Sequence, residues 1–148
     1  MTKLLSTEQM AEFANSGCLF FEGLIDEDIN KEFLNDIGHT DIDDVDNIQH
    51  YFQNIKSSSS IPRIPAGTAL KDAYPLNSPL EKIFKNEIVS GAINSLVGSK
   101  TVVDHQFLHL TFPSKYYEKA NQRQMSQVNH QDSTIDPRTT FDIQLFYF

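Results

Sequence analysis

Apolar residues recur at helical spacing in the N-terminal segment of the chain. Ser6-Thr7-Glu8-Gln9 has the sequence of a capping box, in which an N-cap serine is followed three residues later by a glutamine that reaches back to it. The pattern predicts a helix that begins after this serine, buries Met10, Phe13 and Ala14, and ends at Gly17 in a left-handed conformation.

Two further segments show helical spacing. Asp26 is placed to cap a helix that ends at Gly38. Ser78-Pro79-Leu80-Glu81 combines an N-cap serine with a proline at the first helical position and a glutamate at the third. The apolar positions are Ile29, Phe33 and Ile37 in the first segment, and Ile83, Phe84, Ile88, Ala92, Ile93, Leu96 and Val97 in the second. The second stripe predicts one helix that runs to Gly98.

Short apolar runs between turn residues predict strands. Cys18–Glu22 lies between two glycines and is expected to be a buried strand, with Cys18 in the core. Thr101–Phe112 and Phe141–Phe148 also have the composition of strands. Helices first and strands last predict an α+β fold. A strand that runs to Phe148 would present an unpaired hydrophobic edge, so we expect self-association through it.

The 148 residues are expected to form a single domain, 1–148, with one exposed insertion at 39–60. This insertion contains four aspartates between Asp41 and Asp46 and the serine run Ser57–Ser60. Burial of so polar a segment cannot offset the entropy that ordering it would cost. We therefore expect it to be the most exposed part of the chain.

An excess of acidic residues limits the partners of the chain. Asp+Glu 20 against Lys+Arg 12 gives a formal net charge of −8, which repels phosphate backbones and anionic membrane surfaces. No apolar run approaches the roughly 18 residues of a membrane span, and the N-terminal segment lacks the apolar region of a signal peptide. With Cys18 as its one cysteine, the chain is predicted to be cytoplasmic and to bind neither nucleic acid nor membrane.

His130-Gln131-Asp132 is the strongest candidate for chemistry. On an extended segment, residues i and i+2 share a face, so the imidazole and the carboxylate would converge on one point. Two histidines and one carboxylate on one octahedral face are typical of non-haem Fe(II). The triplet His39-Thr40-Asp41 has the same spacing, but it opens the acidic insertion, where nothing would hold its geometry.

His105 and His109 are weaker candidates. On a helix their spacing would make a metal-binding pair. The apolar residues around them favour a strand, where four residues span roughly 13 Å and two histidines could not chelate one ion. Glycine-rich phosphate loops and Cys-x-x-Cys pairs do not occur in the sequence, which argues against P-loop, Rossmann and zinc-finger proteins.

The order of these segments resembles the phytanoyl-CoA dioxygenase-like family of Fe(II)- and 2-oxoglutarate-dependent dioxygenases. The resemblance lies in the capped helix at Ser6–Gln9, the run Phe13–Ile25, and a strand at Thr101–Phe112 that precedes His130-Gln131-Asp132. It implies that the strands belong to a double-stranded β-helix, or jelly-roll, core. It also implies Fe(II) as the metal and 2-oxoglutarate as the cosubstrate.

The resemblance implies roles for individual residues. His130 and Asp132 would be two of three Fe(II) ligands, and Gln131 would point away from the metal and line the 2-oxoglutarate pocket. Leu108 or His109, on the preceding strand, would contact 2-oxoglutarate. In halogenating relatives, the position that matches Asp132 has no carboxylate. The resemblance therefore implies hydroxylation of a small organic substrate as the reaction.

The chain departs from the family pattern after the motif. Only 16 residues follow Asp132, and none is a histidine. Arg138 lies in a turn-like segment, so it is not assigned to 2-oxoglutarate. The second metal histidine and the arginine of the family are therefore missing, and we expect an N-terminal portion of the enzyme that is inactive by itself.

Two other interpretations stay open. The chain could be a non-catalytic α+β module that binds a metal or a small molecule, or an acidic interaction protein in which His130-Gln131-Asp132 is incidental. Binding of Fe(II) or Mn(II) separates these two interpretations.

Overall fold

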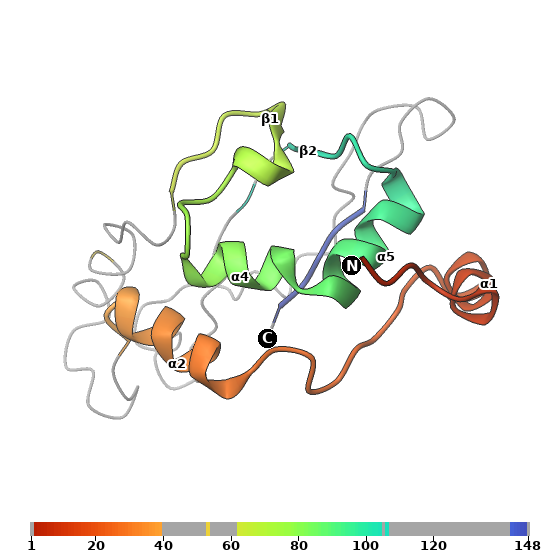
Figure 1. Cartoon of the computed structure of the whole chain (residues 1–148), viewed down its shortest axis with the longest axis horizontal. Helices are drawn as coiled ribbons and strands as arrows, with labels where there is room; N and C mark the ends of the chain where they lie inside the picture. Colours follow the sequence, from red (N-terminus) through yellow and green to blue (C-terminus); the bar gives the residue numbers. More distant parts are fainter. Residues whose placement is uncertain (1, 40–52, 54–61, 105, 107–142, 148) are drawn as a thin grey trace, which may run out of the picture. The chain divides into compact units, whose positions relative to one another are not determined.

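The structure is a computed structural model that describes residues 2–39, 53, 62–104, 106 and 143–147 (Figure 1). The chain divides into two compact units, Met1–Gln106 and Phe107–Phe148. The elements of the first unit are α1 (Thr7–Ser16), α2 (Glu27–Asp36), β1 (Thr68–Ala69), the 3₁₀ helix η2 (Leu70–Asp72), α4 (Pro79–Lys85), α5 (Glu87–Val97) and β2 (Val102–Val103). Helices combined with a small sheet confirm the α+β class.

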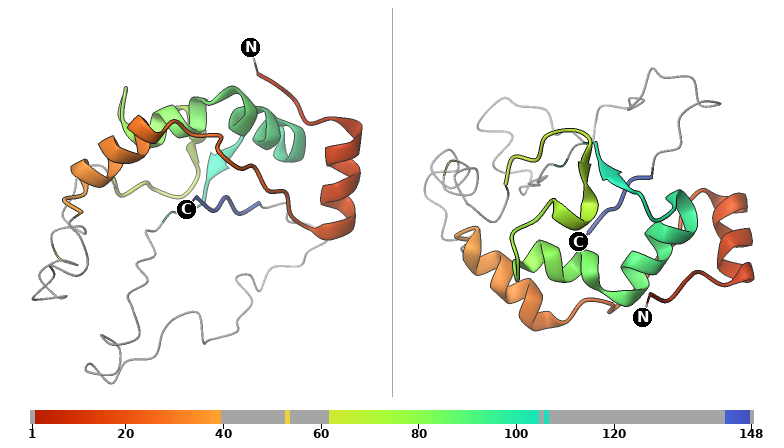
Figure 2. Two further views of the ribbon diagram at one scale, coloured as in Figure 1. Left: turned by 90° about the horizontal axis from the view of Figure 1, so that it is seen from below. Right: turned by 45° about the horizontal axis from the view of Figure 1, so that its top comes forward.

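Helix α1 is capped as its sequence predicts. Ser6 Oγ accepts a hydrogen bond from the Gln9 N–H (3.2 Å), and Gln9 Oε1 accepts one from the Ser6 N–H (2.9 Å). Gly17 ends the helix at φ 76°, a conformation that glycine adopts without a Cβ penalty. The predicted burial is wrong, because no residue of α1 is buried and Met10 is 38% exposed. Figure 2 shows α1 at one end of the first unit, beyond α5.

The segment after α1 does not form the predicted strand. Cys18–Glu22 has no regular secondary structure, Cys18 is exposed, and Phe20 is 83% exposed. A strand requires a neighbour that accepts and donates its backbone hydrogen bonds, and none of the described segments pairs with these residues. An apolar run alone was therefore insufficient to predict a buried strand or a core cysteine.

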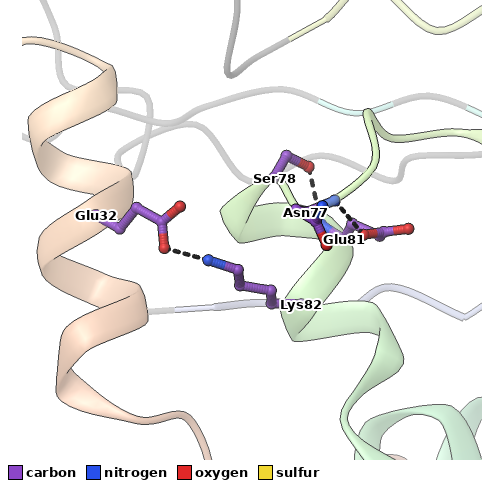
Figure 3. A network of polar contacts seen from close by, with 5 residues as sticks. All are labelled: Glu32, Asn77, Ser78, Glu81 and Lys82. Atoms are coloured by element: carbon purple, nitrogen blue, oxygen red, sulfur yellow. Dashed lines mark hydrogen bonds and ion pairs between the residues drawn. The ribbon is translucent and has the colours of Figure 1, made fainter.

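Helix α2 confirms the second helix prediction. Asp26 occupies the N-cap, although its side chain makes no capping hydrogen bond. Phe33 and Ile37 are buried, and α2 packs against α4. Glu32 of α2 and Lys82 of α4 form an ion pair across this contact (Figure 3). The buried apolar side chains described in the first unit are Phe33, Ile37, Ala73, Pro79, Ile83, Val89 and Ile93.

The predicted helix from Pro79 to Gly98 is two helices. Asn86 separates α4 from α5 with φ −51° and ψ 132°, which is not helical. Its side-chain Oδ1 accepts hydrogen bonds from the N–H groups of Ile88 (2.9 Å) and Val89 (3.3 Å), so it caps α5. Its Nδ2 donates to the carbonyl oxygen of Leu24 (3.2 Å). Figures 1 and 2 show that the chain changes direction between the two helices.

The sheet of the first unit is small. β1 and β2 pair antiparallel, with Thr68 opposite Val103 and Ala69 opposite Val102. Of the predicted strand Thr101–Phe112, only Val102–Val103 is a strand among the described residues, and 105 and 107–112 lie outside them. The pairing partner, β1, precedes α4 and was not predicted.

The second unit has few described residues. Residues 143–147 carry no strand, so the predicted terminal strand is wrong over this stretch, and Phe146 is 68% exposed. The insertion at 39–60 lies outside the described residues except for His39 and Gln53, which are both exposed. The jelly-roll core stays a prediction, because the described residues form one two-stranded sheet.

Candidate functional site

The predicted metal and cosubstrate residues lie outside the described part of the chain. These residues are His130, Gln131, Asp132, Leu108 and His109. The structure therefore does not report whether His130 and Asp132 share a face. Their assignment stays a prediction from sequence.

Within the described residues, no group of three or more histidine, cysteine, aspartate and glutamate side chains is placed to hold a metal ion. His39, from the second His-x-Asp triplet, is exposed, and Asp41 lies outside the described part.

A part-buried set of polar contacts, called here the Tyr74 clamp, holds the chain at the end of the first unit. The Tyr74 hydroxyl donates a hydrogen bond to Gln106 Oε1 (2.8 Å), and Gln106 Nε2 donates to the carbonyl oxygen of Pro62 (2.6 Å). The Tyr74 ring stacks on Phe84 of α4, with ring centroids 4.9 Å apart and planes 10° apart. This Tyr74 clamp joins residues that precede β1, follow η2 and follow β2. Gln106 lies two residues before Leu108 in the sequence.

Burial raises the pKa of Tyr74 to about 12. A phenol with a higher pKa in the folded chain holds its proton more tightly there. Its contribution to stability is therefore complete below its ordinary pKa of 10.0 and is lost as the pH rises toward 12. At neutral pH, Tyr74 is a neutral hydrogen-bond donor.

We expect Tyr74→Phe to reduce the loss of stability between neutral pH and about pH 11. The variant loses the clamp hydrogen bond at every pH, but it has no buried phenol to ionise. Urea unfolding at the two pH values measures the difference. Tyr147→Phe, in the second unit, is measured in parallel, and it should reduce the alkaline loss in the same direction because burial also raises the pKa of Tyr147. An equal alkaline loss in the wild type and Tyr74→Phe would contradict the prediction.

A second polar network surrounds the start of α4 (Figure 3). Ser78 Oγ accepts a hydrogen bond from the Glu81 N–H (3.2 Å), which confirms the predicted N-cap. Glu81 also accepts from the Asn77 N–H (2.6 Å) and pairs with Lys85 (2.6 Å). The hydrogen bond from Lys85, followed by that from Asn77, lowers the pKa of Glu81. Helix capping and an i,i+4 ion pair explain these contacts, so the network stabilises α4.

The N-terminal segment docks on α5. The Lys3 N–H donates to the carbonyl oxygen of Glu87 (3.0 Å), and the Leu5 N–H donates to Ser95 Oγ (3.0 Å). A small hollow of about 100 Å³ lies beside this contact. Its lining residues are Lys3, Leu4, Leu5, Gln9, Phe21 and Ile88. Sequence patterns gave no indication of this contact, apart from a glycine inside α5.

No family model, curated protein or solved structure matches the chain. None of the helices in the described residues is both long and apolar enough to cross a membrane.

Proposed function

We propose that the chain contributes His130 and Asp132 to an Fe(II) site of a 2-oxoglutarate-dependent oxygenase that hydroxylates a small organic substrate. The triplet His130-Gln131-Asp132 carries this proposal. An imidazole and a carboxylate two residues apart on an extended segment form two adjacent corners of the ligand set that Fe(II) prefers in such enzymes.

The N-terminal elements agree with the family pattern only in part. The resemblance implies a capped helix, a glycine, a hydrophobic strand and a second helix, and the first unit contains α1, Gly17 and α2 in this order. The expected strand at Cys18–Glu22 is not present, so the agreement extends to the helices and the glycine. The double-stranded β-helix core is part of the same proposal.

The donor set determines what the residues of the chain would do. His130 would bind the metal through one neutral ring nitrogen, so its other nitrogen needs a hydrogen-bond acceptor to hold the ring. Asp132 would bind through a carboxylate oxygen and lower the charge of the site. Gln131 and either Leu108 or His109 would line the 2-oxoglutarate pocket. Bound Fe(II) would supply the oxidative chemistry with 2-oxoglutarate and O₂.

Mn(II) binding tests the metal site, because Mn(II) accepts the same ligands and can be followed by the electron paramagnetic resonance signal of the free ion. We expect His130→Ala to weaken Mn(II) binding by about tenfold or more, which corresponds to about 1.4 kcal/mol. His39→Ala is the matched control, because it removes the histidine of the other His-x-Asp triplet. It should leave the affinity unchanged.

Two outcomes separate the competing interpretations. Equal Mn(II) binding by the wild type and His130→Ala would contradict the metal site and favour an interaction protein. With two ligands at the motif, we expect no succinate from 2-oxoglutarate when Fe(II) and ascorbate are supplied. Succinate that His130→Ala abolishes would show that His105, His109 or a second subunit supplies the third ligand.

A further inference from the structure

The N-terminal segment lies so close to α5 that residue 91 must be glycine. A Cβ on residue 91 would lie 1.7 Å from the carbonyl oxygen of Lys3 and 2.4 Å from its carbonyl carbon. Both atoms belong to the backbone, so the clash could not be relieved by a side-chain rotation. Glycine destabilises a helix interior more than any other residue except proline. Its presence inside α5 therefore indicates a close backbone approach.

Two hydrogen bonds flank this close approach and are donated by backbone N–H groups. Lys3 donates to the Glu87 carbonyl and Leu5 donates to Ser95 Oγ, four residues before and four residues after Gly91. Ser95 Oγ itself donates to the Gly91 carbonyl (2.8 Å), which orients its oxygen toward Leu5. Positions four residues apart lie on one face of a helix, so one face of α5 contacts the backbone of Lys3–Leu5.

The contact involves few side chains. Leu4, between the two donors, is 64% exposed, and no residue of α1 is buried. Segments with few buried contacts open locally at a lower free energy than the core. We therefore expect Lys3–Leu5 to separate from α5 without unfolding of α2, α4 and α5.

We propose that the face of α5 around Gly91 is a docking groove for an extended peptide backbone, and that Lys3–Leu5 is a releasable strap that occupies it within the chain. The strap holds α1 beside α5 and forms one wall of the hollow against Phe21 and Ile88. Because the groove contacts the backbone, a peptide added to the solution can replace the strap once the strap is weakened. This proposal does not depend on the iron site.

The experiment uses the full chain and a fluorescent peptide with the sequence of residues 2–10. Leu5→Pro in the full chain removes the N–H that donates to Ser95 while keeping an extended backbone before it. We expect the peptide to bind Leu5→Pro at least about tenfold more tightly than the wild type, in which the strap competes. In Leu5→Pro combined with Gly91→Ala, peptide binding should be lost because the added Cβ fills the groove.

Hydrogen exchange provides a second measurement on the wild type and Gly91→Ala. The Lys3 and Leu5 amides should be protected in the wild type and should exchange about tenfold or more faster in Gly91→Ala. Alanine is the better helix former, so faster exchange would report loss of the strap and not of α5. Asn35→Ala, an exposed position of α2, controls for a gain in helix propensity elsewhere. Unchanged exchange in Gly91→Ala, or equal peptide binding by the wild type and Leu5→Pro, would overturn the proposal.

Discussion

Replacing Ile83 by alanine is expected to lower the free energy of unfolding of the first unit by about 2–5 kcal/mol. Ile83 is 2% exposed, and it lies on α4, which packs against both α2 and α5. Truncation removes three buried carbon atoms and leaves a cavity that the surrounding helices fill only in part. Since small domains are stable by about 5–15 kcal/mol, this is a large fraction of the total.

Urea unfolding followed by circular dichroism measures the effect, with two variants as controls. Ile83→Val removes one methyl group from the same site and should cost about 0.5–1.5 kcal/mol. Leu76→Ala removes an apolar side chain that is 76% exposed and should change stability by about 0.5 kcal/mol or less. If Ile83→Ala proved no more costly than Leu76→Ala, the assignment of Ile83 to the core would be wrong.

Asn86→Ala is expected to cost about 2 kcal/mol, because two different interactions disappear. Asn86 Oδ1 caps α5 by accepting from Ile88 and Val89, and loss of an N-cap costs about 1 kcal/mol. Asn86 Nδ2 donates to Leu24, whose carbonyl oxygen would lose a part-buried partner at a similar cost. Stability in urea and helix content are the measurements.

Asn86→Asp separates the two interactions. Aspartate is an equally good N-cap residue, but its carboxylate cannot donate to Leu24. We therefore expect the free energy of unfolding of Asn86→Asp to lie between that of the wild type and that of Asn86→Ala. A rise in helix content with no loss of stability in Asn86→Ala would mean that α4 and α5 join into the one continuous helix that the apolar stripe predicts.

Residue spacing can identify only those site residues that are close together in the sequence. His130 and Asp132 were identified as candidate metal ligands because they lie two residues apart in the sequence. Their role as ligands stays a prediction, which the Mn(II) titration tests. The Tyr74 clamp could not be found in this way, because Tyr74 and Gln106 are 32 residues apart and no local pattern relates them. Gly91 did carry a signal, since a glycine within an apolar helical stripe indicates that another backbone approaches closely.

The sequence by itself determined several helix starts and ends, although not the break at Asn86. The caps at Ser6, Gly17 and Ser78 were predicted correctly because a cap joins residues three or four positions apart, and its hydrogen bonds need nothing from the rest of the chain. The α+β class was predicted from the order of helical and strand-like segments, although Val102–Val103 is the only part of those segments that is a strand among the described residues.

Strand formation and burial were decided only by the tertiary structure. Cys18–Glu22 has the apolar character of a strand but no partner among the described residues, whereas the short segment Thr68–Ala69 is a strand because Val102–Val103 pairs with it. Similarly, α1 has apolar residues at helical spacing, yet none is buried in the described structure. Backbone pairing and burial both require a second surface, and a pattern along one segment cannot specify which surface the fold brings to it.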